Sequence, residues 1–170
     1  GVEDGDQGKQ RMPRDHWLDY TGESLFKSTA ALREQIPAWA QGKLKIAMDL
    51  HCPSIVGKGH EYIHLVGEPD KTIAAEQVRF ASILSGQDGE LDFPADNILP
   101  WGTGWNISSN YKLGLSFSTW MSKVQGLMFA TTLEFPYSNA EGKKITPENS
   151  RVFGKDIAHA VFEYLQNPNE

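Results

Sequence analysis

The segment GHEYIHLVGEPD, residues 59–70, contains two histidines whose spacing could bind zinc. His60, Glu61 and His64 match the HExxH pattern, in which two histidines one helical turn apart hold the ion and the glutamate activates water. This chemistry needs a helix, because in a strand the two histidines would lie about 13 Å apart. A proline and two glycines stand just upstream, and residues 61–66 are rich in Tyr, Ile and Val, which favours a strand. We therefore predict that the match is accidental and keep an HExxH endopeptidase as a minor alternative.

A second pair of candidates stands at the ends of two apolar runs. His51 ends KLKIAMDLH, residues 43–51, and Glu134 lies near the end of LMFATTLEFPY, residues 127–137. A lone histidine at a strand end is more often structural than a metal ligand. A carboxylate in a strongly apolar strand, however, is costly unless it is paired or functional. Ligands of α/β folds gather at the carboxyl ends of strands, where both residues stand.

The elements that must position these residues alternate between helix and strand. Apolar residues at helical spacing predict a first helix that Pro37 kinks or shortens and Gly42 ends. In the following strand, alternation places Leu44, Ile46, Met48 and Leu50 on one side. The order predicts an α/β fold, a three-layer domain with a mixed sheet flanked by helices. The expected elements are helices in 23–42, 70–86, 111–126 and 146–167, strands in 43–51, 61–67 and 127–137, and a long loop over 87–110.

Composition narrows the classes of function. The 170 residues carry a net charge of −6 without a basic stripe, so we expect no nucleic-acid partner. No apolar run approaches the roughly 18 residues of a membrane span. Cys52 is the single cysteine, which excludes an internal disulfide. Because it follows His51 and points to the opposite face of a strand, we expect it to be a small buried apolar residue.

Three segments, in this order, resemble a known family: VEDGDQGKQRMPRDH followed by DY, then MDLHCP, then ATTLEFPY. They closely resemble the zinc carboxypeptidase superfamily, the funnelin metallopeptidases, and the likeness covers nearly the whole chain. The resemblance implies zinc-dependent hydrolysis of a peptide or amide bond, with His51 as a metal ligand and Glu134 as the base that activates water. It also implies that Arg11 polarises the substrate carbonyl and that Tyr111 faces the substrate.

Each of the minor candidates has a plain structural interpretation beside the functional one. Arg11 is equally consistent with a solvated surface arginine, and Tyr111 fits a core or surface tyrosine better. Asp49 lies two residues before His51 and so on the same face of a strand, where it could orient a metal-bound imidazole. A carboxylate bonded to backbone donors explains Asp49 at least as well.

Two departures from the family pattern limit the expected activity. No His-x-x-Glu ligand pair lies upstream of His51, so we expect residues 1–170 to be the C-terminal part of the catalytic domain, without an intact zinc site and inactive alone. Trp17 and Leu18 replace the Asn-Arg pair that recognises a terminal carboxylate in the family. The alternative is therefore a degenerate, non-catalytic member that binds peptide or cell-wall material. A truncated sheet exposes edges and apolar faces, so we also expect self-association.

Overall fold

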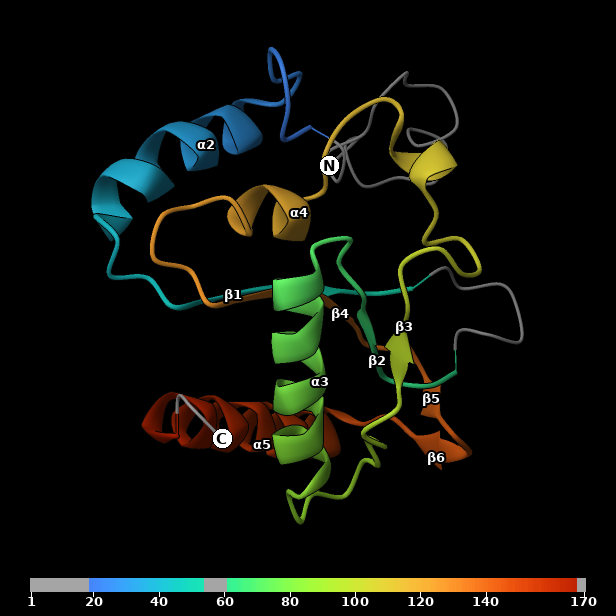
Figure 1. The fold of residues 1–170 in the computed structure, drawn as a ribbon. Coiled ribbons are helices and arrows are strands. Elements are labelled where there is room, and N and C mark those ends of the chain that lie inside the picture. The colour runs from blue at the N-terminus through green and yellow to red at the C-terminus, as the bar shows by residue number, and fades with distance from the viewer. Residues whose placement is uncertain (1–18, 54–60, 168–170) are drawn as a thin grey trace.

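A computed structural model of the chain describes residues 19–53 and 61–167, which form a mixed α/β fold around a four-stranded sheet (Figure 1). The strand order is β1-β4-β2-β3. The first pair, β1 and β4, is parallel, β2 runs antiparallel to β4, and β3 is parallel to β2, so the sheet is mixed as predicted. The strand bounds are β1 Ile46–His51, β2 His64–Val66, β3 Ile98–Leu99 and β4 Phe129–Glu134.

Helices lie on both faces of this sheet. Two long helices, α3 and α5, pack against each other, and α3 also contacts β4, whereas the short helix α4 contacts β4 and β1. No helix in the described part of the chain is long and apolar enough to cross a membrane. The remaining elements are α2 Lys27–Ala40, α3 Lys71–Ser85, α4 Phe117–Met121, α5 Pro147–Gln166, a 3₁₀-helix over Ser108–Tyr111, and a small hairpin of β5 Asn139–Ala140 and β6 Lys143–Lys144.

The central strand β4 is buried along its whole length and separates two apolar clusters. Phe129 and Leu133 belong to the larger cluster, which α3 and α5 complete. Ala130 belongs to the smaller cluster, together with Met121 of α4. Because side chains alternate along a strand, Thr132 and Glu134 lie on the α4 face with Ala130. The α4 face therefore carries the polar residues from which the site is built.

The predicted C-terminal helix is confirmed, and its first turn explains where it begins. Thr146 accepts a hydrogen bond from the Asn149 backbone, and the Asn149 side chain accepts one from the Thr146 backbone. This reciprocal pair satisfies amides that the helix itself leaves open. Pro147 follows at the first helical position, where its missing N–H costs nothing.

Two predicted elements were wrong in extent. The helix expected over 111–126 is formed only by Phe117–Met121, because Ser116 caps it through the Thr119 backbone and Gly114 interrupts the segment before it. The loop expected over 87–110 contains β3, whose two residues were too few to produce an alternating pattern. The residue types of so short a segment do not reveal a strand, because its stability comes from pairing with a neighbouring strand.

One expectation about an individual residue was wrong. Cys52 is exposed and not buried, because β1 ends at His51 and alternation no longer applies beyond it. Leu50, at the end of the outermost strand of the described sheet, is 68% exposed. Pro37 lies inside α2, which ends at Ala40, two residues before Gly42.

Candidate functional site

His51 and Glu134 are partners in the sheet at the carboxyl ends of two parallel strands. They occupy the same register position of β1 and β4. The Nδ1 atom of His51 lies 3.7 Å from Oε2 of Glu134, with side chains 26% and 8% exposed. The imidazole is therefore open to solvent on one side, while the carboxylate is nearly enclosed. The sequence placed both residues at strand ends, and the sheet brings them together.

Glu134 has one carboxylate oxygen without a hydrogen bond. Its Oε2 atom is buried and accepts no hydrogen bond from a described residue. The Nδ1 atom of the His51 imidazole lies 3.7 Å from it and forms an ion pair with it when the ring is protonated. A buried carboxylate oxygen in this state can accept a proton or a hydrogen bond from a bound molecule.

His64 lies on the other side of Glu134 in the same row. It pairs with Glu134 across the antiparallel strands β2 and β4 and is 1% exposed. Its ring stacks on Tyr62 with a centroid distance of 4.6 Å. Residues 61–64 contain no helix and His64 begins a strand, so the geometry that HExxH needs is absent there and the predicted strand is confirmed. His60 lies outside the described residues.

Tyr111 lies near the carboxylates of Glu134 and Glu68, and contacts with a neighbouring loop hold it there. Its hydroxyl donates to Oδ1 of Asn106 at 2.9 Å, and its ring packs on Trp101 at 5.1 Å between centroids. Burial raises the pKa of Tyr111, and the nearby charges of Glu68 and Glu134 raise it further. The phenol therefore remains protonated over the physiological pH range and can donate a hydrogen bond.

Glu68 is a buried acid on this face that the sequence reasoning missed. One of its oxygens accepts a hydrogen bond from Oγ1 of Thr119 at 2.8 Å, and its backbone amide donates to the buried side chain of Gln77. Burial raises the pKa of Glu68, while hydrogen bonds from Ser118 and Thr119 lower it. The signal that could have found it is its place directly after the apolar run of β2.

A chain of hydroxyl groups connects Glu68 with the strand that carries Glu134. Ser118 lies 3.3 Å from the hydroxyl of Thr132, and Ser116 bonds to both Ser118 and Thr119. Thr132 stands two residues before Glu134 and so on the same face. Sequence patterns gave no reason to select these small polar residues, because serine and threonine are common at helix starts.

Of the remaining predicted site residues, only Asp49 lies in the described part of the chain. Asp49 pairs with Thr132 in the register of β1 and β4, two positions before the pair formed by His51 and Glu134. Burial of Tyr20 raises the pKa of its hydroxyl, and the nearby charge of Asp49 raises it further. The role of Asp49 toward a metal-bound imidazole stays a prediction. Arg11 and the pair Trp17-Leu18 lie outside the described residues.

The described residues do not complete a zinc site by themselves. A zinc site needs about three protein donors. Residues 19–53 and 61–167 hold no cluster of three His, Cys, Asp or Glu side chains placed to hold one ion. His51 can serve as one donor, and a set of three would need at least one ligand from outside these ranges.

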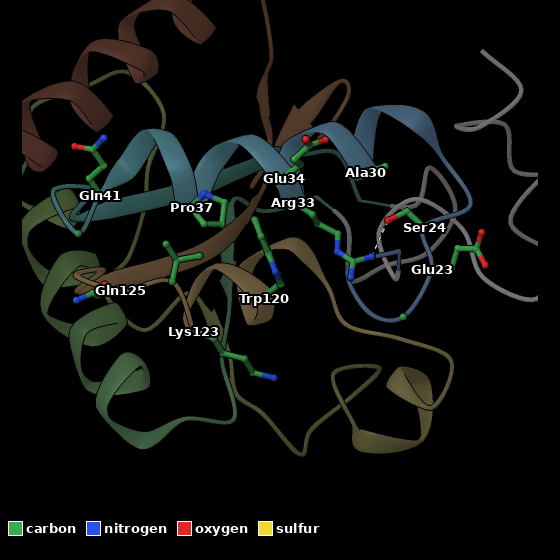
Figure 2. A pocket seen from close by; sticks show the side chains of 13 residues that line it. Glu23, Ser24, Ala30, Arg33, Glu34, Pro37, Gln41, Trp120, Lys123 and Gln125 are labelled. Atoms are coloured by element: carbon green, nitrogen blue, oxygen red, sulfur yellow. Dashed lines mark hydrogen bonds between the residues drawn. The ribbon is translucent and has the colours of Figure 1, made fainter.

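A separate groove of about 760 Å³ lies between α2 and α4 (Figure 2). Arg33 of α2 and Trp120 of α4 project into it, and Arg33 donates to Oγ of Ser24 at 2.7 Å. Its lining combines basic with acidic side chains and includes neither His51 nor Glu134. The mixed charge gives the groove no clear preference for a class of ligand.

Comparisons of the chain with protein-family models, curated proteins and solved structures found no match. The site is therefore interpreted from its own residues.

Proposed function

We propose that this chain belongs to a zinc-dependent hydrolase of peptide or amide bonds, of the carboxypeptidase type. In this proposal His51 is a metal ligand and Glu134 is the general base. The observation that carries it is the register of β1 and β4, which sets an imidazole 3.7 Å from a buried carboxylate oxygen that accepts no hydrogen bond from the described residues. The quoted motifs around these two residues support the same assignment.

Glu134 has the contacts that a general base requires. Its carboxylate is nearly enclosed, so a water molecule held beside Oε2 would have few other acceptors. As that water attacks the substrate carbonyl, a C–O bond forms and its proton passes to Glu134. The same proton then passes to the leaving nitrogen as the C–N bond breaks, which returns Glu134 to its starting state.

Tyr111 and zinc have supporting roles in the proposal. Tyr111 stays protonated and can donate its one hydrogen bond to a substrate oxygen near Glu134 if it exchanges Asn106 for the substrate. When bound, zinc supplies a Lewis acid for the carbonyl and lowers the pKa of bound water toward 7. The described residues offer too few donors for a closed zinc site, so the steps above are those of Glu134 and Tyr111 alone.

The test uses the full product of the reading frame that encodes residues 1–170. Zinc content is measured by elemental analysis, and hydrolysis is measured with a panel of short peptides and their amides. We expect His51→Ala to reduce zinc content and Glu134→Gln to retain zinc while reducing turnover by about a hundredfold or more. Glu148→Gln, on an exposed side chain of α5, is the matched control and should change neither.

The outcomes separate the proposal from its alternatives. If Glu134→Gln leaves turnover unchanged, Glu134 is not the general base. If His51→Ala leaves the zinc content unchanged, His51 is not a metal ligand. Saturable peptide binding without hydrolysis would favour the non-catalytic alternative.

A further inference from the structure

A second cavity, of about 230 Å³, lies on the α3–α5 side of the sheet, away from the face that carries Glu134. It is enclosed by the end of α3, the segment that follows it and the first half of α5. Apolar side chains form one part of its wall: Leu84, Leu91, Phe93, Pro94 and Phe153. Polar residues form the rest, among them the acids Asp92 and Asp156.

Asp156 is the most enclosed acid of this cavity. The residue is 9% exposed, whereas Asp92 is exposed to solvent. The carboxylate of Asp156 lies directly over Gly89, where an added Cβ atom would be only 1.8 Å from Oδ2. Glycine at position 89 is thus what allows the acid to occupy this place. A carboxylate enclosed in this way is costly unless a neighbouring group or a bound molecule neutralises it or donates a hydrogen bond to it.

Charged side chains act on Asp156 in both directions. Burial raises the pKa of Asp156, the solvent-exposed His159 and Lys155 lower it, and Asp88 raises it. The other acid of the lining, Asp92, is already paired with Lys143. Lys143 lies 2.8 Å from Asp92 and donates to the backbone carbonyl of Glu90 at 3.0 Å.

The wall also indicates what kind of cation would fit. A metal ion needs several oxygen, nitrogen or sulfur donors, and the described residues offer no such group of three here. A primary ammonium on an aliphatic stem needs one strong acceptor and an apolar surface along its carbons. Asp156 supplies the acceptor, and Leu91, Phe93 and Phe153 supply the surface.

We propose that this cavity binds a primary alkylammonium group, with the nitrogen at Asp156 and the alkyl stem along Leu91, Phe93 and Phe153. Lysine side chains and free alkylamines share this chemistry. The proposal is independent of the hydrolase assignment, because it involves neither His51 nor Glu134 and has a binding readout of its own.

The test is an NMR titration of the ¹⁵N-labelled chain with n-butylammonium chloride at constant ionic strength and neutral pH, with n-butanol as the uncharged control. We expect saturable shifts confined to amides of residues 84–94 and 153–156, with n-butanol binding at least tenfold more weakly. Shifts spread evenly over acidic surface residues, or equal binding of n-butanol, would overturn the proposal. Nα-acetyl-lysine methylamide in a second titration shows whether a lysine side chain on a backbone is accepted as well as the free amine, and failure of both amines refutes the site.

Variants test the role of the carboxylate. Asp156→Asn keeps the shape and removes the charge, so it should weaken butylammonium binding at least tenfold, whereas Asp96→Asn, an exposed acid nearby, should leave it unchanged. Unchanged binding in Asp156→Asn would refute the assignment. If that variant does not fold, the carboxyl ¹³C signal of Asp156 in the unaltered protein decides. Bound ammonium must lower the pKa of Asp156, and a pKa that stays the same when the amine is added contradicts the proposal.

Discussion

The imidazole of His51 and the carboxylate of Glu134 stand side by side because their strands run parallel and end at the same level of the sheet. Neither residue is near the other in sequence, and no turn or helix connects them. The pairing of β1 with β4 alone fixes their separation. A shift of this register by one residue would move one of the two side chains to the opposite face.

This contact predicts an energetic coupling between the two residues. In a double-mutant cycle with His51→Ala and Glu134→Gln, the free energies of unfolding should differ from additivity by about 0.5–3 kcal/mol. The measurement is urea unfolding of the four proteins at neutral pH. His51→Ala combined with Glu148→Gln is the control pair and should be additive within about 0.5 kcal/mol. Additivity in both cycles would mean that the contact is not formed in solution.

Gln77 should be among the most sensitive polar residues of the core. It is fully buried, and its amide nitrogen donates to the carbonyls of Val66 and Ala130, while its oxygen accepts from the Glu68 amide. Gln77→Leu removes these three buried hydrogen bonds and should lower the free energy of unfolding by about 2–4 kcal/mol. Gln35→Leu, on an exposed face of α2, should change it by less than about 0.5 kcal/mol in the same thermal or urea measurement. Equal effects would contradict the hydrogen bonds described.

Gly126 and Gly142 offer a matched test of a close backbone approach. Both have φ of +86°, but a Cβ atom at Gly126 would lie 2.1 Å from the carbonyl oxygen of Gly42, whereas nothing lies within 4 Å at Gly142. Gly142→Ala should cost about 1 kcal/mol for the left-handed backbone alone. Gly126→Ala should cost clearly more, because it must also separate the turns before β1 and β4. Chemical unfolding of both variants checks the difference, and equal losses would show that these turns are not in contact.

Glu68 should make stability depend on pH in a defined direction. Burial raises its pKa above the ordinary value of 4.5, so the folded chain binds this proton more tightly than the unfolded chain. Its contribution is fully present below the ordinary value and is lost as the pH rises through the folded pKa. Glu68→Gln imitates the protonated form and should therefore be more stable than the unaltered protein at pH 7–8, by roughly 1 kcal/mol. This advantage should disappear below the ordinary pKa.

Unfolding curves measured across the pH range test this prediction. Glu90→Gln, on an exposed side chain, provides the control and should show a difference that does not vary with pH. A Glu68→Gln variant less stable than the parent at neutral pH would show that the ionised form is the one favoured by the fold.

Self-association stays a prediction, and the exposed apolar residues suggest where it would occur. Trp39 of α2 is 73% exposed, and Leu50 lies at the exposed end of the outermost strand of the described sheet. We expect residues 1–170 to form concentration-dependent oligomers in light scattering. Trp39→Lys and Leu50→Lys should shift the population toward monomer, whereas Phe162→Lys, an exposed apolar residue on α5, should have a smaller effect. A monomer at all concentrations would contradict the expectation.

The sequence by itself determined the elements whose signals are local. Thr146 and Pro147 predicted the start of α5, and the apolar runs ending at His51 and Glu134 predicted β1 and β4. Helix capping, the fixed φ of proline and the apolar run of a buried strand each depend on residues a few positions apart. They can therefore be recognised from the sequence alone. The same signals placed His51 and Glu134 at strand ends, where functional residues gather in α/β folds.

Only the tertiary structure decided which of these residues meet. His64 looked like one half of an accidental zinc motif, yet the antiparallel pairing of β2 with β4 sets it beside Glu134. Glu68 had only its place just after an apolar run to indicate it, and its importance comes from the hydroxyl group that α4 places against it. Strand order and register are chosen by the burial of whole faces, a free energy summed over segments distant in sequence. For this reason the neighbours of Glu134 follow from the assembled sheet and not from any local stretch of the chain.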